Sequence, residues 1–282
     1  MKKLLTLTVM CLVAIAAFAL EKADIEVSYN YEYPNYRTAV RGSQNQYILL
    51  ANGTNSKFFS PKTEYIDSLK STAEGMAKLN EMTNNAMING NYDDIPRADG
   101  AYYVIKSVSD NKLYNYETVG MDKLYSEEPI DVISWEICDS TKSILGYECV
   151  KAYSEFHGRK WNVWFAPEIP IQAGPWKLSG LPGLILDAES DDKMYLFVVT
   201  GIEQTAKQIG HIYLSDNYEK VSRKEMLKAK RAYFDNPLGN INSQLSGKDV
   251  TVSIQDEKGN SISGTQGLFA TREEVDFIEI DY

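Results

Sequence analysis

Few side chains in this 282-residue sequence could act as a general base or activate a nucleophile. Only two histidines occur, His157 and His211. His157 stands beside Gly158 between two strand-like runs, which is typical of a solvated turn, and His211 lies in a strand-like Gly-His-Ile-Tyr run. The chain has no Gly-x-Ser-x-Gly elbow. The sequence therefore predicts no catalytic residue that depends on histidine.

Acidic side chains offer a second kind of chemistry. Asp187 and Glu189 alternate on one predicted strand, and Asp191 and Asp192 follow them. A pair of carboxylates is sufficient for glycoside hydrolysis and needs no sequence signature, so a glycosidase stays open. A calcium site in 187–192 also stays open, although the spacing is not that of an EF-hand. We favour a solvated strand edge and assign no metal and no cofactor.

Cys138 and Cys149 are predicted to form a disulfide. The runs around them are strand-like, and 139–142 is typical of a turn, which would bring the two residues opposite each other in a hairpin. Free thiols or a metal pair are the alternatives, but two cysteines and two histidines make a poor zinc set.

Residues 1–19 are predicted to be a cleaved signal peptide. Lys2 and Lys3 precede an apolar run that ends in Ala17-Phe18-Ala19, a small-x-small site. Cys11 lies inside this run rather than at its end, which disfavours a lipoprotein. We therefore expect an exported protein, periplasmic, outer-membrane-associated or extracellular, with no transmembrane segment after cleavage.

The remaining chain, residues 20–282, is predicted to be one β-rich domain. Strand-like runs dominate: 25–33, 47–50, 58–59, 102–108, 113–119, 132–138, 149–156, 161–165, 184–188, 194–201 and 209–214. Helical spacing occurs over 62–86, and Ser222-Arg223-Lys224-Glu225 is a capping box. The expected fold is mainly β: a curved antiparallel sheet, an open barrel or bowl, with two or three covering helices.

A Pro- and Gly-rich segment carries a family resemblance. Gly174-Pro175-Trp176 leads into Gly180-Leu181-Pro182-Gly183-Leu184-Ile185, with Ile144-Leu145-Gly146-Tyr147-Glu148-Cys149 upstream. These residues resemble the GLPGLI family of exported bacterial proteins, whose biochemistry is uncharacterised. A looser likeness is to the bowl-shaped β module that precedes the catalytic domain of a bacterial glycoamidase, and it implies an accessory module. The hexapeptide lacks the Lys-Ser/Thr of a phosphate-binding loop.

The amino-acid composition limits the classes of partner that we expect for this protein. The formal net charge is −10, which argues against nucleic acid, and 19 tyrosines suit a half-exposed sheet. A Tyr- and Trp-rich curved sheet favours a non-catalytic envelope protein that binds a peptide, lipid or glycan, with Trp161, Trp164 and Trp176 as candidate contacts. A carboxylate-dependent glycan hydrolase and a structural component of an outer-membrane assembly are the alternatives.

Overall fold

The computed structural model describes residues 21–35, 40–98, 102–244, 254–255, 261–262 and 276–282. The predicted signal peptide lies outside these residues, so it and the single domain over 20–282 stay predictions. Within the described part of the chain, no helix is both long and apolar enough to cross a lipid bilayer.

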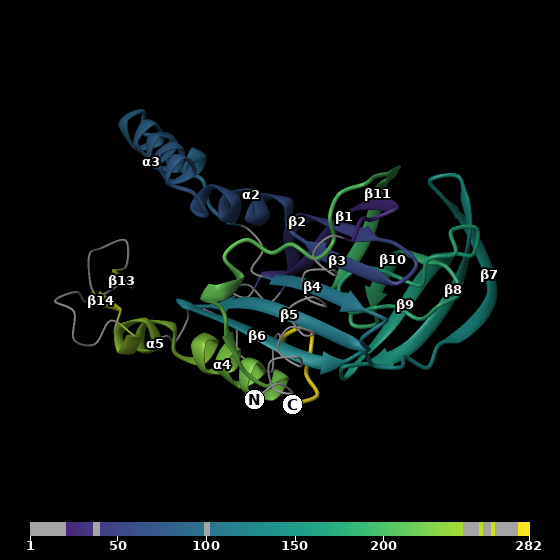
Figure 1. Ribbon diagram of the computed structural model, residues 1–282. Helices are drawn as coiled ribbons and strands as arrows, with labels where there is room; N and C mark the ends of the chain where they lie inside the picture. Colours follow the sequence, from purple (N-terminus) through teal and green to yellow (C-terminus); the bar gives the residue numbers. More distant parts are fainter. Residues whose placement is uncertain (1–20, 36–39, 99–101, 245–253, 256–260, 263–275) are drawn as a thin grey trace, which may run out of the picture.

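One twelve-stranded sheet dominates the molecule (Figure 1), in the order β12-β6-β5-β4-β3-β2-β1-β11-β10-β9-β8-β7. Neighbouring strands are antiparallel except β12 and β6. The strands are β1 (Ile25–Asn35), β2 (Val40–Ala51), β3 (Asn55–Phe59), β4 (Tyr102–Ser107), β5 (Lys112–Val119), β6 (Asp122–Pro129), β7 (Glu136–Ile144), β8 (Tyr147–Phe156), β9 (Arg159–Ala166), β10 (Leu184–Ser190), β11 (Leu196–Gln204) and β12 (Glu219–Lys220). A separate pair joins β13 (Ile254–Gln255) and β14 (Ser261–Ile262).

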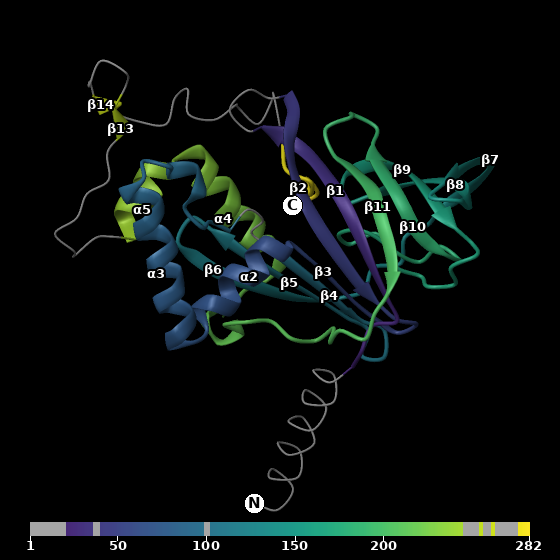
Figure 2. The same cartoon turned by 90° about the horizontal axis from the view of Figure 1, so that it is seen from above.

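The sheet is strongly curved and does not close, because β12 and β7 each have only one neighbour (Figure 2). Register shifts at Ser28/Tyr29 on β1 and at Ile185/Asp187 on β10 add to the bending. The expected mainly β fold, with an open curved sheet and a few helices, is confirmed.

Four α-helices lie at one end of the sheet (Figure 1): α2 (Pro61–Lys70), α3 (Ala73–Ile88), α4 (Arg223–Asp235) and α5 (Pro237–Gln244). The predicted helix over 62–86 is two helices, because Thr72 caps a new one by accepting from the Gly75 amide. The predicted capping box of α4 is confirmed, since Ser222 and Glu225 cap each other reciprocally. The described residues also form two short 3₁₀ turns, η1 (Tyr92–Asp94) and η2 (Ser215–Asn217).

Two predicted strands need correction: the run 132–138 is a strand only from Glu136 onward, and the run 209–214 is not a strand. The run 132–138 is a loop up to Trp135, and Val132 is 95% exposed. The run 209–214 also lies outside the sheet, although Ile209 and Ile212 are buried against it. In both segments a short apolar run packs against the protein and holds a loop in place. A strand-like sequence pattern cannot distinguish such a packed loop from a hydrogen-bonded strand.

The Pro- and Gly-rich segment between β9 and β10 packs into the core. Trp176, Leu178 and Leu181 are buried with Trp161 and Phe197. The Leu178 carbonyl accepts from Lys106 Nζ at 3.1 Å, and the Ser179 carbonyl accepts from Trp135 Nε1 at 2.9 Å. The rings of Trp161 and Trp176 thus hold this irregular segment against the sheet.

The predicted disulfide is wrong, since Cys138 and Cys149 are both free. The hairpin turn falls at Leu145-Gly146, whose φ angles of 49° and 87° are those of a tight two-residue turn. The cross-strand partner of Cys149 is therefore Lys142, and Cys138 lies within a register shift further along β7. Burial and the nearby charge of Asp187 raise the pKa of Cys149 to about 11, so its thiol is inert at neutral pH.

Candidate active site: a polar groove on strands β7 to β11

A groove of about 390 Å³ lies on one face of the strands β8 to β11. Register explains which side chains reach it: Lys151 on β8 is opposite Trp164 on β9, and Trp164 is opposite Asp187 on β10. Cross-strand partners point to the same face of a sheet. The full lining is Lys142, Lys151, Asn162, Trp164, Asp187, Ala188, Glu189, Asp191, Lys193 and Leu196.

Two carboxylates stand side by side in this groove. Asp187 and Glu189 are two residues apart on β10, so they share a face with Cα atoms about 6.5–7 Å apart. Asp187 accepts from Lys142 Nζ at 2.9 Å and from the Val199 amide at 3.2 Å. Donors from β7 and from the neighbouring strand β11 thus fix its position.

Glu189 is held ionised. Burial alone would raise the pKa of Glu189, but hydrogen bonds from Lys193 and Arg41, with the charges of both, outweigh burial and lower it. Its oxygens lie 2.7 Å from Lys193 Nζ and 2.9 Å from Arg41 Nη1. At neutral pH this side chain is therefore a carboxylate, bound on both oxygens by cations.

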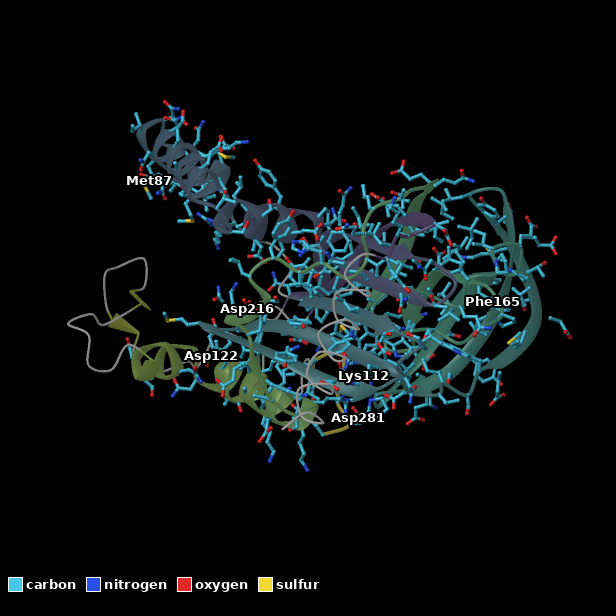
Figure 3. The ribbon with its side chains drawn as sticks, viewed as in Figure 1. Met87, Lys112, Asp122, Phe165, Asp216 and Asp281 are labelled. Atoms are coloured by element: carbon cyan, nitrogen blue, oxygen red, sulfur yellow. The ribbon has the colours of Figure 1, made fainter. Side chains whose placement is uncertain are left out.

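The three predicted tryptophan contacts lie in two environments. Trp161 and Trp176 are core residues, 0% and 3% exposed. Trp164 alone lines the groove, with Lys142 Nζ 4.6 Å from its ring centroid. Figure 3 labels the next residue, Phe165, on the curved flank of the sheet.

The acidic stretch differs from the expected solvated edge. β10 pairs on both sides, with β9 and β11, so it is an interior strand. Asp187 is 16% exposed at its side chain, and Asp192 pairs with Arg159. Alternation along the strand predicts that Asp187 and Glu189 share a face. It does not predict that this face is hollowed, because other strands supply the rest of the lining.

A second hollow of about 390 Å³ lies between the sheet and α4, and half of its described lining residues are aromatic. Tyr31 stacks on Tyr33 there, with centroids 5.1 Å apart. Among its described lining residues Glu117 is the one carboxylate, and Lys230 Nζ lies 2.7 Å from it. A single carboxylate paired with a lysine is less suited to hydrolysis than the pair in the polar groove.

Comparisons with known proteins find one matching family and two similar solved structures. A family described as "N-glycanase peptide, N-terminal domain" matches residues 95–227, just under half of the chain. The solved structure titled "Structure of PNGF-II in P21 space group" matches 74% of this chain with a TM-score of 0.50 and 14% identity. PNGF-II in the C2 space group matches 73% with a TM-score of 0.49 and 14% identity. No curated protein matches the chain. The chain spans about a third of the length of the two solved structures, 33% and 32%.

These findings correct the family assignment. The resemblance to the GLPGLI family is wrong, because the family that matches is the N-terminal domain of N-glycanase. The hexapeptide is explained locally: Gly180 has a φ of 92°, and a Cβ on Gly183 would lie 2.3 Å from the Ala166 carbonyl oxygen. Leu181, Leu184 and Ile185 are buried. A tight, buried corner requires such residues, so packing explains the hexapeptide.

The main functional expectation is also wrong. A non-catalytic binding or accessory module was expected, whereas the matching family carries the name of a glycanase. The name of this family is closer to the alternative of a glycan hydrolase.

Proposed function

We propose that this chain hydrolyses a bond in a glycan and that the polar groove is its active site. The observation that carries the proposal is the meeting of Trp164, Asp187 and Glu189 in one hollow. An aromatic face can stack on the apolar face of a sugar ring, and a pair of carboxylates can carry its hydrolysis. The match to the N-glycanase domain family gives independent support.

Each charged side chain has a role in this proposal. Glu189, kept ionised by Arg41 and Lys193, takes a proton from the attacking water. The ammonium of Lys142, held by Asp187, gives a proton to the leaving atom as its bond to the sugar breaks. Solvent then returns the proton from Glu189 to Lys142, so each cycle consumes one water.

Water attacks the sugar directly in this proposal, because Glu189 acts as a base and not as a nucleophile. No covalent sugar–enzyme intermediate forms.

The test uses the purified full chain and a denatured glycoprotein, with free oligosaccharides as a second substrate. Released sugar and trimmed protein are both measured by mass spectrometry. We expect Glu189→Gln and Asp187→Asn to lower kcat by about 100-fold or more, and Trp164→Ala to raise KM. Glu203→Gln is the matched control, since Glu203 is exposed on β11 outside the groove.

Two results would refute the proposal. One is Glu189→Gln with unchanged kcat. The other is folded wild-type protein that releases no sugar from either substrate.

We also propose that the chain is exported, as its first 19 residues predict. Fractionation of cells that produce the full chain tests this, and retention of the unprocessed chain in the cytosol would contradict it.

A further inference from the structure

The charged cluster around His157 lies outside the groove, and its charges hold one another. The prediction that His157 is a solvated turn residue is wrong: the backbone does turn there, with a φ of 52°, but the side chain is 7% exposed. Arg223 Nη2 donates to His157 Nδ1 at 2.9 Å, and Arg223 Nε donates to Glu279 Oε2 at 2.6 Å. The C-terminal segment 276–282 covers this cluster, since the Ile280 amide donates to the His157 carbonyl at 3.1 Å.

The polar groove differs from this cluster, because one of the three lysines in its described lining has no partner. Lys142 Nζ lies 2.9 Å from Asp187 Oδ2, and Lys193 Nζ lies 2.7 Å from Glu189 Oε2. Lys151 lines the groove and is half-buried, and it forms no ion pair or side-chain hydrogen bond with the described residues. A half-buried cation without a partner favours the binding of an anion beside it.

A side-chain amide without a partner lies close to this lysine. Asn162 lines the groove from β9, and its side chain has no hydrogen-bond partner among the described residues. It lies two residues before Trp164 on the same face of β9, and Lys151 is the cross-strand partner of Trp164. Such diagonal neighbours have Cα atoms about 7–8 Å apart, so the ammonium and the amide can both donate to one anionic group beside the indole.

The carboxylate of the lining that has no ion pair with the described residues lies at the other end of the groove. The Asp191 amide donates to the Lys160 carbonyl at 2.8 Å, which places Asp191 beside the start of β9. Trp164 is four residues further along this strand, about 13 Å away. This separation exceeds the screening length of about 8–10 Å at moderate salt, so Asp191 does not neutralise Lys151.

We propose that the groove selects glycans that carry an acidic sugar, whose acidic group binds Lys151 and Asn162 beside Trp164. This inference rests on the proposed function, because the same groove receives the sugar. A lysine binds a carboxylate or a sulfate as a point charge, so both kinds of acidic sugar fit the chemistry. A neutral sugar forms no charge-assisted hydrogen bond with Lys151 and binds more weakly. Bond cleavage stays with Asp187 and Glu189, so Lys151 determines specificity alone.

Equilibrium binding to the purified full chain tests the inference without relying on hydrolysis. The probes are sialyllactose, sulfated lactose and lactose itself, and tryptophan fluorescence reports their binding. We expect at least one of the two acidic sugars to bind about tenfold more tightly than lactose at low salt. The difference should shrink at about 500 mM salt, because the ions screen the charge of Lys151.

Three variants identify the side chains that are responsible. Lys151→Met keeps the length of the side chain and removes its charge, so acidic sugars and lactose should bind with affinities within about twofold of each other. Asn162→Asp has nearly the same shape, and its added carboxylate should weaken the binding of acidic sugars by about tenfold and leave that of lactose unchanged. Lys224→Met is the matched control, because Lys224 is exposed on α4 outside the groove.

The inference is overturned if no probe binds, if lactose binds as tightly as both acidic sugars, or if Lys151→Met keeps the preference for acidic sugars. Sugar release is measured separately and reports on the proposed hydrolysis. Release without a preference for acidic sugars refutes this inference alone, whereas binding of acidic sugars without release refutes the hydrolysis alone.

Discussion

Lys106 places a side-chain ammonium in the interior, 5% exposed, where it donates to the Lys177 carbonyl at 2.7 Å. Burial, with the charge of Lys177, lowers the pKa of Lys106 to about 7, whereas the unfolded chain keeps it near 10.5. Between these two values the unfolded state binds the extra proton. The free energy of unfolding therefore gains a contribution that rises with pH from about 7 to 10.5.

We predict that Lys106→Met removes this pH dependence. Urea unfolding at pH 7, 8 and 9 measures it, and the stability of wild type minus variant rises by up to about 1.4 kcal/mol per pH unit. Lys112→Met is the control, because its exposed ammonium has a raised pKa and titrates little in this range. Parallel curves for wild type and Lys106→Met would contradict the assignment.

Sequence reasoning is weakest at this scale. Trp164 and Trp161 belong to one strand and differ in environment because odd and even positions face opposite sides of β9. Alternation along a strand predicts two faces and cannot say which one is hollowed. His157 shows the same limit, since Gly158 correctly predicts the turn and does not reveal the segment 276–282 that covers it.

At the scale of elements, the loop between β9 and β10 depends on close backbone contact at Gly183. A Cβ there would meet Ala166 and Pro167 backbone atoms at 2.3–2.9 Å. We predict that Gly183→Ala destabilises the fold by about 1–3 kcal/mol, the usual range for overpacking. Equilibrium urea unfolding, monitored by tryptophan fluorescence, measures this.

Gly42→Ala provides the comparison for that prediction. Nothing lies within 4 Å of a Cβ at Gly42, which lies in β2. Its effect should stay within about 0.5 kcal/mol. An equal loss of unfolding free energy in the two variants would show that the close contact at Gly183 is not the cause of the destabilisation.

Elements with strong local signals were predictable from the sequence. The capping box of α4 and the alternating strand β1 need no distant partner to be recognised. The predicted disulfide is wrong because a bulge in β7 and a turn at Leu145-Gly146 set the register of the hairpin. The turn was not predictable, since leucine is not a residue that usually adopts a left-handed conformation. The sequence predicts that the sheet is curved but not where it bends, since the positions of bulges depend on packing between strands.

For the whole molecule, the pairing of β1 with β11 joins the two flanks of the sheet. We predict that native-state hydrogen exchange is slowest in β1 and β11 and faster in the end strand β7. Central strands exchange only through global opening, whereas an end strand can detach locally. Mass spectrometry of peptic peptides measures this, and equal protection of β1 and β7 would show that the flanks open separately.

The pairing of β1 with β11 also limits how early the complete sheet can form during synthesis. Ile25 lies opposite Gln204, so the first described strand waits for a partner that follows it by nearly 180 residues. During synthesis or passage through a membrane, β1 to β6 can assemble as one incomplete half, with one edge of β1 bare. A ribosome or translocase that stalls before residue 196 would therefore leave an aggregation-prone ribbon, which makes this stretch a natural client for chaperones that shield strand edges.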